Sequence, residues 1–215
     1  MRETRVAAER RTERAGAWLW VFCLQFFVME QVVRRGWRIP YSFRANYVSD
    51  LGAQFCVPGL CSPWHAWMNA SFLLQGALMA VGALRLWGEV GRGWLGRLGL
   101  LLLMVSGIGL IGVGFVPEDV STVVHARVAV AYFLGGGFGV LVIGLALLWG
   151  RRVGAGLVSV VVGVVVLAAT VMVANMSKLP THSEVGAVER VAVYGLTGWL
   201  VGMGWRLLRA TRARG

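Results

Sequence analysis

The sequence predicts an all-α integral membrane protein, a polytopic bundle of six transmembrane helices with both termini in the cytoplasm. Of its 215 residues, 57% are hydrophobic and only 14% are charged, and the mean hydropathy is +0.68. A soluble domain carries about a quarter charged residues. The net charge of +11 is spread between long apolar runs, so we assign it to membrane ends and expect a lipid bilayer, not nucleic acid, as the partner.

Six segments are apolar over a length that can cross a bilayer, which takes about 20 residues at a rise of 1.5 Å each. They cover approximately residues 17–33, 64–87, 95–116, 125–149, 156–176 and 188–208. Residues 1–16 form a basic arm before them, and residues 209–215 form a basic tail. Only residues 34–63 form a long connection, so no soluble domain is expected.

The basic residues also predict the orientation. With both termini in the cytoplasm, the inner segments hold 14 of the 21 Lys and Arg residues, and basic residues of short loops stay on the cytoplasmic side. Three arginines directly after the first span oppose this arrangement. Glu30 is placed to pair with Arg34 at i,i+4 and lower their cost. The expected mid-membrane polar residues are Gln25, Asn69 and Gln75, none of them charged, so an ion pump or voltage sensor is not expected.

Small residues and cysteines predict how the chain is held together. Gly135 and Gly139, like Gly198 and Gly202, have the four-residue spacing typical of helix packing faces in membranes, and such faces also suit partner membrane helices. Cys56 and Cys61 flank a Val-Pro-Gly-Leu turn in the loop expected outside. This spacing is compatible with a disulfide and with two free thiols.

The three histidines, His65, His125 and His182, stand at or before the starts of the even-numbered spans. In an up-and-down bundle these starts share the outer face, where Glu118, Glu184 and Glu189 also lie, so we expect a polar site there. The predicted ligand-binding residues are Asn46, Asp50, His65, Asn69, Asp119, His125 and Arg127. The candidate catalytic residues are His65, His125, Asp50 and Asp119.

A metal is one hypothesis for this face. Two or three imidazoles with a carboxylate make the ligand shell typical of catalytic zinc. The candidate zinc ligands are His65, His125 and His182, which would come from three separate loops because no H-E-x-x-H or H-x-H spacing is present.

Helix capping is the alternative explanation for several of these polar residues. Ser62 and Pro63 have the order of an N-cap and a first helical residue. Residues 181–184 (THSE) have the spacing of a capping box. Glu118 and Asp119 precede a helix N-terminus, where acids are favoured. Capping does not account for the histidines.

Several motifs are similar to a known family. They are residues 46–53 (NYVSDLGA), 62–65 (SPWH), 68–72 (MNASF) and 114–119 (GFVPED) followed by His125, and Glu189-Arg190 in the last span. Together they resemble the six-span bacterial membrane proteins designated domain of unknown function nine-nine-eight, over about residues 17–208. The resemblance implies the helical fold and a multi-pass location in the bacterial plasma membrane, and it implies no particular reaction.

Three functions fit these observations. The favoured one is a binding or accessory membrane protein whose outer mouth holds a lipid head group or a small polar ligand. The alternative is an outer-leaflet enzyme, either a metal-assisted hydrolase or an acid–base enzyme acting on a lipid or isoprenoid. A structural role in a larger complex, through glycine-rich faces and partner helices, stays open.

Overall fold

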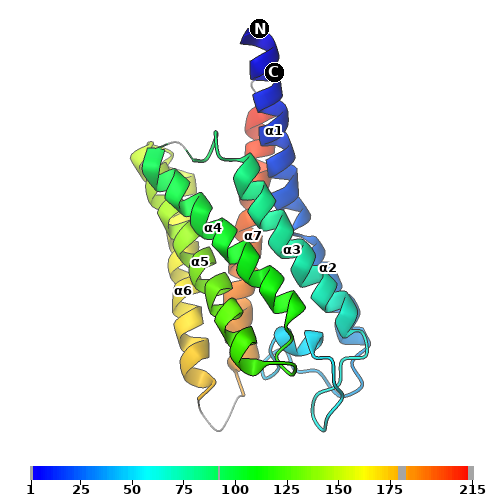
Figure 1. Ribbon diagram of the computed structural model, residues 1–215. Helices are drawn as coiled ribbons and strands as arrows, with labels where there is room; N and C mark the ends of the chain where they lie inside the picture. The colour runs from blue at the N-terminus through cyan, green and yellow to red at the C-terminus, as the bar shows by residue number, and fades with distance from the viewer. Residues whose placement is uncertain (1, 92, 179–182, 213–215) are drawn as a thin grey trace.

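The computed structural model describes residues 2–91, 93–178 and 183–212 and consists of long helices that run up and down side by side (Figure 1). The helices are α1 (Arg2–Phe22), α2 (Gln25–Arg35), α3 (His65–Arg85), α4 (Gly93–Phe115), α5 (Thr122–Trp149), α6 (Val153–Met176) and α7 (Val185–Arg212), with a short 3₁₀ turn η1 (Ser49–Gly52). We call the end of the bundle that carries residues 36–64 the loop end. The opposite end, where both termini lie, is the terminal end.

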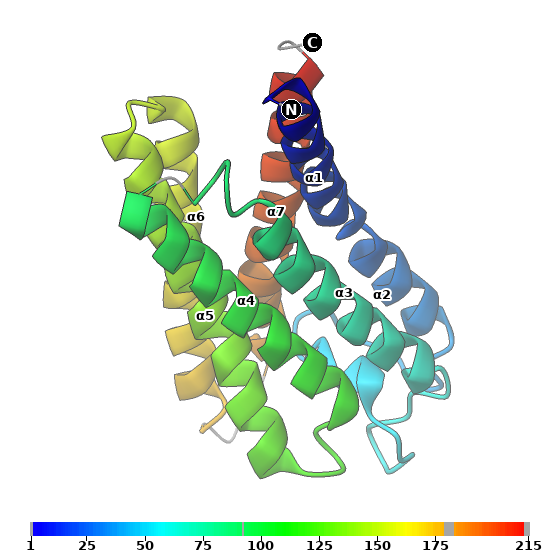
Figure 2. The ribbon, with the colours of Figure 1, turned by 45° about the horizontal axis from the view of Figure 1, so that its top comes forward.

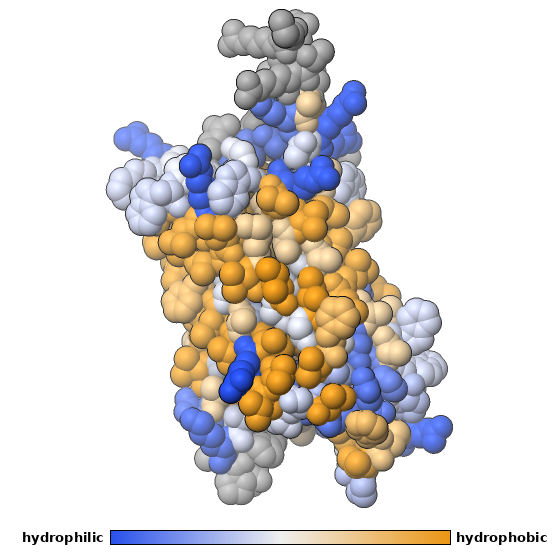
Figure 3. Space-filling model, in the orientation of Figure 1, coloured by the Kyte–Doolittle hydropathy of each residue, from blue (hydrophilic) through white to orange (hydrophobic). Residues whose placement is uncertain are grey.

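Six helical segments of the described chain are long and apolar enough to cross a membrane. Apolar side chains cover most of the middle of the molecule, and hydrophilic ones gather toward its two ends (Figure 3). The exposed large side chains include Phe115, Val161 and Val164, which suit contact with lipid tails. The predicted all-α, six-span membrane fold is therefore confirmed, and each predicted span overlaps a helix.

The first span differs from the prediction of one segment at residues 17–33. It consists of α1 and α2, which together form a candidate crossing over Ala8–Arg35. The amides of Cys23 and Leu24 donate to carbonyls three residues earlier, at 3.2 and 3.1 Å. This tighter turn interrupts the α-helical ladder. The basic arm is helical as well, because α1 starts at Arg2 and packs along α7 (Figure 2).

Glycines allow neighbouring helices to approach closely. A methyl group on Gly107 of α4 would lie 2.5 Å from the carbonyl oxygen of Gly76 in α3. Gly135 and Gly139 of α5 pack in the same way against α4, as predicted. The prediction for Gly198 and Gly202 was wrong, because a Cβ on either would meet no described atom within 4 Å.

A chain of polar side chains crosses the interior between α2, α3 and α7. Ser71 donates to Gln25 Oε1 at 2.9 Å, and Gln25 Nε2 donates to Gln75 Oε1 at 3.1 Å. Gln75 Nε2 in turn donates to Thr197 Oγ1 at 3.3 Å. These bonds satisfy the expected mid-membrane amides Gln25 and Gln75 and join the three helices where water cannot compete.

Candidate functional site

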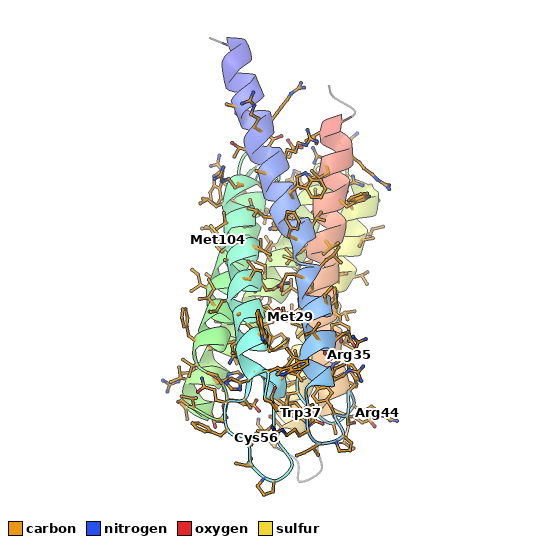
Figure 4. The ribbon with its side chains drawn as sticks, turned by 90° about the vertical axis from the view of Figure 1, so that its right-hand side faces the viewer. Met29, Arg35, Trp37, Arg44, Cys56 and Met104 are labelled. Atoms are coloured by element: carbon orange, nitrogen blue, oxygen red, sulfur yellow. A yellow bond between two sulfur atoms is a disulfide. The ribbon has the colours of Figure 1, made fainter. Side chains whose placement is uncertain are left out.

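Residues 36–64, which we call the loop cap, fold over the loop end of the bundle. Figure 4 shows Trp37, Arg44 and Cys56 gathered there. A disulfide joins Cys56 and Cys61, which confirms the bonded alternative. Trp37 is 9% exposed and its ring contacts that of Tyr41, with centroids 5.0 Å apart. The cap is therefore packed onto the helices instead of projecting from them.

Polar side chains of the helices and short loops fasten the cap by binding its backbone. Asn69 Nδ2 donates to the carbonyl of Gly52 at 2.9 Å. Asp119 accepts from the amide of Phe55 at 2.7 Å, and Glu189 accepts from the amide of Val48 at 2.6 Å. Two of the predicted ligand-binding residues, Asn69 and Asp119, thus hold the cap in place.

The residue predicted to cap the N-terminus of α3 has another role. Ser62 is not the N-cap of α3, because the helix begins at His65 after Trp64 and no side chain caps it. The Ser62 hydroxyl donates to the carbonyl of Leu51 at 2.7 Å instead. His65 Nδ1 lies 2.9 Å from the Ser62 carbonyl oxygen and bonds to it. At the start of α3, side-chain to backbone hydrogen bonds that involve the loop cap therefore take the place of helix N-capping.

A cluster of carboxyl groups lies where the loop cap meets the bundle. We call Asp50 of the cap, Glu118 and Glu189 the acid cluster. Asp50 Oδ2 accepts from Asn46 Nδ2 at 3.1 Å and from the amide of Tyr47 at 3.0 Å. Ser49 donates to Glu118 Oε2 at 2.8 Å. Because η1 turns immediately after residues 46–48, Ser49 and Asp50 both face Glu118 in the loop before α5.

Burial is the main cause that raises the pKa of the Asp50 carboxyl, to about 8, and a hydrogen bond to Glu118 with its nearby charge raises it further. Asp50 therefore holds a proton near neutral pH. Burial and the charges of all three members of the acid cluster raise the pKa of Tyr47 to about 12. The three carboxyl groups thus lie close to one another, and Asp50 and Glu189 are buried.

A small cavity of about 30 Å³ lies between the acid cluster and the interior of the bundle. Its polar side is formed by Ser49, His125 and Glu189, and its other walls are mainly aromatic and aliphatic. The aromatic lining residues are Phe26, Phe72, Tyr132 and Phe133. A space of this size with several polar partners holds about one water molecule.

His125 is oriented by the backbone. It is 8% exposed, and its Nδ1 lies 2.8 Å from the carbonyl oxygen of Val116. A carbonyl only accepts, so the neutral ring donates from Nδ1 and leaves Nε2 as an acceptor. His125 thus combines with the acid cluster to give a site rich in hydrogen-bond acceptors.

A buried ion pair behind the acid cluster was not predicted. Arg190 Nε lies 3.0 Å from Glu30 Oε1, and the two side chains are 6% and 0% exposed. Tyr194 donates to the other Glu30 oxygen at 2.6 Å. The expected Glu30–Arg34 pair was wrong, since Glu30 faces α7 and the Arg34 guanidinium lies 4.8 Å over the Phe43 ring. The sequence analysis did not predict this charged pair inside the bundle, next to the loop cap.

Arg190 connects this ion pair to the loop cap. Its NH1 donates to the carbonyls of Phe43 and Asn46 at 3.0 and 2.8 Å, and its NH2 contacts the Tyr41 hydroxyl. The sequence signal for this pair was one acidic residue in the first predicted span and one arginine near the start of the last. Their separation by 160 residues hid the pairing.

Arg127, another predicted residue, does not join this site. Arg127 is exposed and is not among the described residues that line the cavity. His182 and Thr181, the first two residues of the predicted capping box, lie outside the described residues. Glu184, its last residue, pairs with Arg44. Over residues 2–91, 93–178 and 183–212, no group of three or more His, Cys, Asp or Glu side chains could hold a metal ion.

The fold and the capped polar site define a multi-pass α-helical membrane protein. The chain belongs to the family described as "Protein of unknown function (DUF998)", whose profile matches residues 15–206. This confirms the resemblance expected from the motifs. Comparison with curated proteins and with solved structures finds no match.

Proposed function

We propose that the protein is a binding protein of the bacterial plasma membrane, with its loop end outside and both termini in the cytoplasm. Its ligand is a lipid head group or small polar molecule that donates hydrogen bonds. The observation that supports this proposal is an aromatic-walled cavity at one end of the bundle, lined by His125 and by Glu189 of the acid cluster. Asp50 and Glu118 lie beside it, next to Ser49 of the cavity wall.

The chemistry of the site selects the ligand class. Carboxyl oxygens accept hydrogen bonds, as does the Nε2 of a neutral His125 ring, and bonds to charged groups are the strong ones. A hydroxyl or ammonium group therefore fits better than a phosphate. The aromatic walls suit the apolar part of a lipid.

The present cavity holds about one water molecule, so a head group enters only when the loop cap shifts. Asp50, Glu118, Glu189 and His125 are the residues proposed to contact it. Asn46, Asn69, Asp119 and His65 act as positioning residues, since they bind Asp50 or the cap segment. Arg127 is left at the rim, on the exposed side of α5.

The test compares lipids that differ in donor groups. The purified full chain is titrated in detergent with phosphatidylethanolamine, a glucosyl diacylglycerol and phosphatidylcholine, and bound lipid is measured by native mass spectrometry. Phosphatidylcholine has no N–H or O–H donor in its head group. We expect at least one donor lipid to bind about tenfold more tightly than phosphatidylcholine, the effect of one hydrogen bond to a charged group.

The variants Glu118→Gln and Glu189→Gln are expected to lose this preference. Glu184→Gln is the matched control, because Glu184 lies at the same end and pairs with Arg44 outside the cavity. Equal binding of all three lipids, or an equal loss in the control, contradicts the proposal.

One observation favours an acid–base enzyme as the second candidate. A protonated Asp50 hydrogen-bonded to Glu118 is a proton donor beside an acceptor, the arrangement used in general acid–base catalysis. Mass analysis of the same lipids after incubation separates the two functions. Cleaved lipid that disappears with Asp50→Asn supports the enzyme, and unchanged lipid supports binding alone.

A further inference from the structure

A second site lies at the terminal end, on the opposite side of the molecule from the acid cluster. Two adjoining clefts of about 440 and 670 Å³ open there. Both are lined by Glu89 and Arg152, whose side chains approach to 3.8 Å. The first cleft lies against the ends of α4 and α5, and the second lies against the last turns of α7.

The charge of this double cleft is positive. Arg152, Arg206 and Arg209 line it, against the single carboxylate of Glu89. Glu89 is 5% exposed and lies next to Arg152, so it offsets one arginine. Arg206 and Arg209 are exposed on α7, and the Arg209 guanidinium lies 5.5 Å over the Trp205 ring. Two arginines of one helix face thus present their donors to an anion.

A glycine on α7 leaves room for the second cleft. Gly202 lines it, and a Cβ at Gly202 would meet no described atom within 4 Å. Gly202 belongs to the glycine pair that does not pack against another helix, so the space beside it is available to a ligand.

Tryptophans place the cleft at head-group depth. Trp94 and Trp149 are 72% and 85% exposed and line the first cleft, and Trp205 lines the second. Exposed tryptophans of membrane proteins collect at the boundary between hydrocarbon and water. Leu95 and Leu147 continue the wall of the first cleft into the apolar part of the bundle.

We propose that this cleft binds an anionic phospholipid of the leaflet at the terminal end. Its phosphate and charged head group bind Arg206 and Arg209, and its acyl chains follow the apolar wall beside Leu95 and Leu147. Basic pockets between membrane helices suit such lipids, and guanidinium groups match phosphate geometry. The site differs from the acid cluster in sign of charge, membrane end and ligand.

The experiment titrates the full chain in detergent with phosphatidylglycerol, phosphatidylcholine and soluble glycerol phosphate, with native mass spectrometry as the readout. We expect phosphatidylglycerol to bind at least tenfold more tightly than phosphatidylcholine. The double variant Arg206→Gln/Arg209→Gln is expected to lose most of this difference, because each arginine contributes to attraction of the anionic head group.

The matched control is Arg11→Gln/Arg14→Gln. It removes the same charge with the same spacing from exposed positions of α1 at the same end, and it is expected to keep the preference. Thermal unfolding in detergent checks that both double variants remain folded. The proposal is overturned if the control loses binding equally, if phosphatidylcholine binds as well as phosphatidylglycerol, or if glycerol phosphate binds as tightly as the lipid.

Discussion

Asp50 interacts with several of the polar groups at the loop end. It follows a turn that supplies two donors, from Asn46 and the Tyr47 amide, and it faces Glu118. The sequence predicted Asp50, Asn46 and His125 as neighbours because their segments end at the same face. It did not predict that Asn69 and Asp119 hold the backbone of the loop cap, because a sequence displays polar side chains but not the backbone groups that they bind.

The raised pKa of Asp50 predicts how stability depends on pH. The folded state keeps a proton that the unfolded chain releases above the ordinary pKa of about 4. Stability from this group is therefore greatest at low pH, falls as pH rises from about 4 to about 8, and then levels off. Asp50→Asn is expected to reduce this slope, as measured by thermal unfolding in detergent between about pH 5 and pH 9. Glu184→Gln is the control and is expected to keep the pH dependence of stability. An unchanged pH dependence in Asp50→Asn contradicts a raised pKa of Asp50.

At the scale of the elements, helix length was predictable and helix contacts were only partly so. An apolar run of about 20 residues identifies a span whatever its neighbours are. The break between α1 and α2 was not predictable, since residues 23 and 24 are Cys and Leu and neither disrupts a helix by itself. The contact between α2 and α7 was not predictable either, because the residues that link the two helices are far apart in the chain.

The Glu30–Arg190 pair is expected to be the main polar link between α2 and α7. Glu30→Gln leaves Arg190 buried without its carboxylate, and such a loss costs about 3–5 kcal/mol of unfolding free energy. Denaturant unfolding in mixed micelles measures this cost. The double variant Glu30→Leu/Arg190→Leu is expected to recover part of it, because it buries no unpaired charge.

Arg44→Gln provides the comparison for this ion pair. Arg44 and Glu184 form a pair at the same end, but their side chains are 74% and 42% exposed. Solvent screens an exposed pair, so its contribution to stability is small. If Arg44→Gln destabilises the protein as much as Glu30→Gln does, burial is not what makes the Glu30–Arg190 pair important.

At the scale of the whole molecule, the two ends have opposite chemistry. The loop end contains the buried acid cluster under a disulfide-bonded cap, and the terminal end presents arginines around a tryptophan-lined cleft. Composition predicted the basic terminal end, because the arginines are contiguous with the termini in sequence. The cleft itself depends on how α4, α5 and α7 diverge, which no local pattern encodes.

The difference between the two ends predicts the orientation of the protein in the membrane. Basic residues favour the cytoplasmic side, and a disulfide persists outside it, so both features place the loop cap outside. After treatment of intact cells with a membrane-impermeant phosphine, the exposed Cys56 is expected to react with a membrane-impermeant maleimide. Buried Cys23 is expected to stay unlabelled.

Thr211→Cys, in a Cys56→Ser/Cys61→Ser background, reports the other end and is expected to react only after lysis. The reverse pattern, with Thr211→Cys labelled in intact cells and the loop cap protected, would place the arginines outside and the acid cluster inside. In that orientation, the head group bound at the loop end would belong to the cytoplasmic leaflet. The labelling pattern therefore decides which leaflet supplies the lipid for each of the two sites.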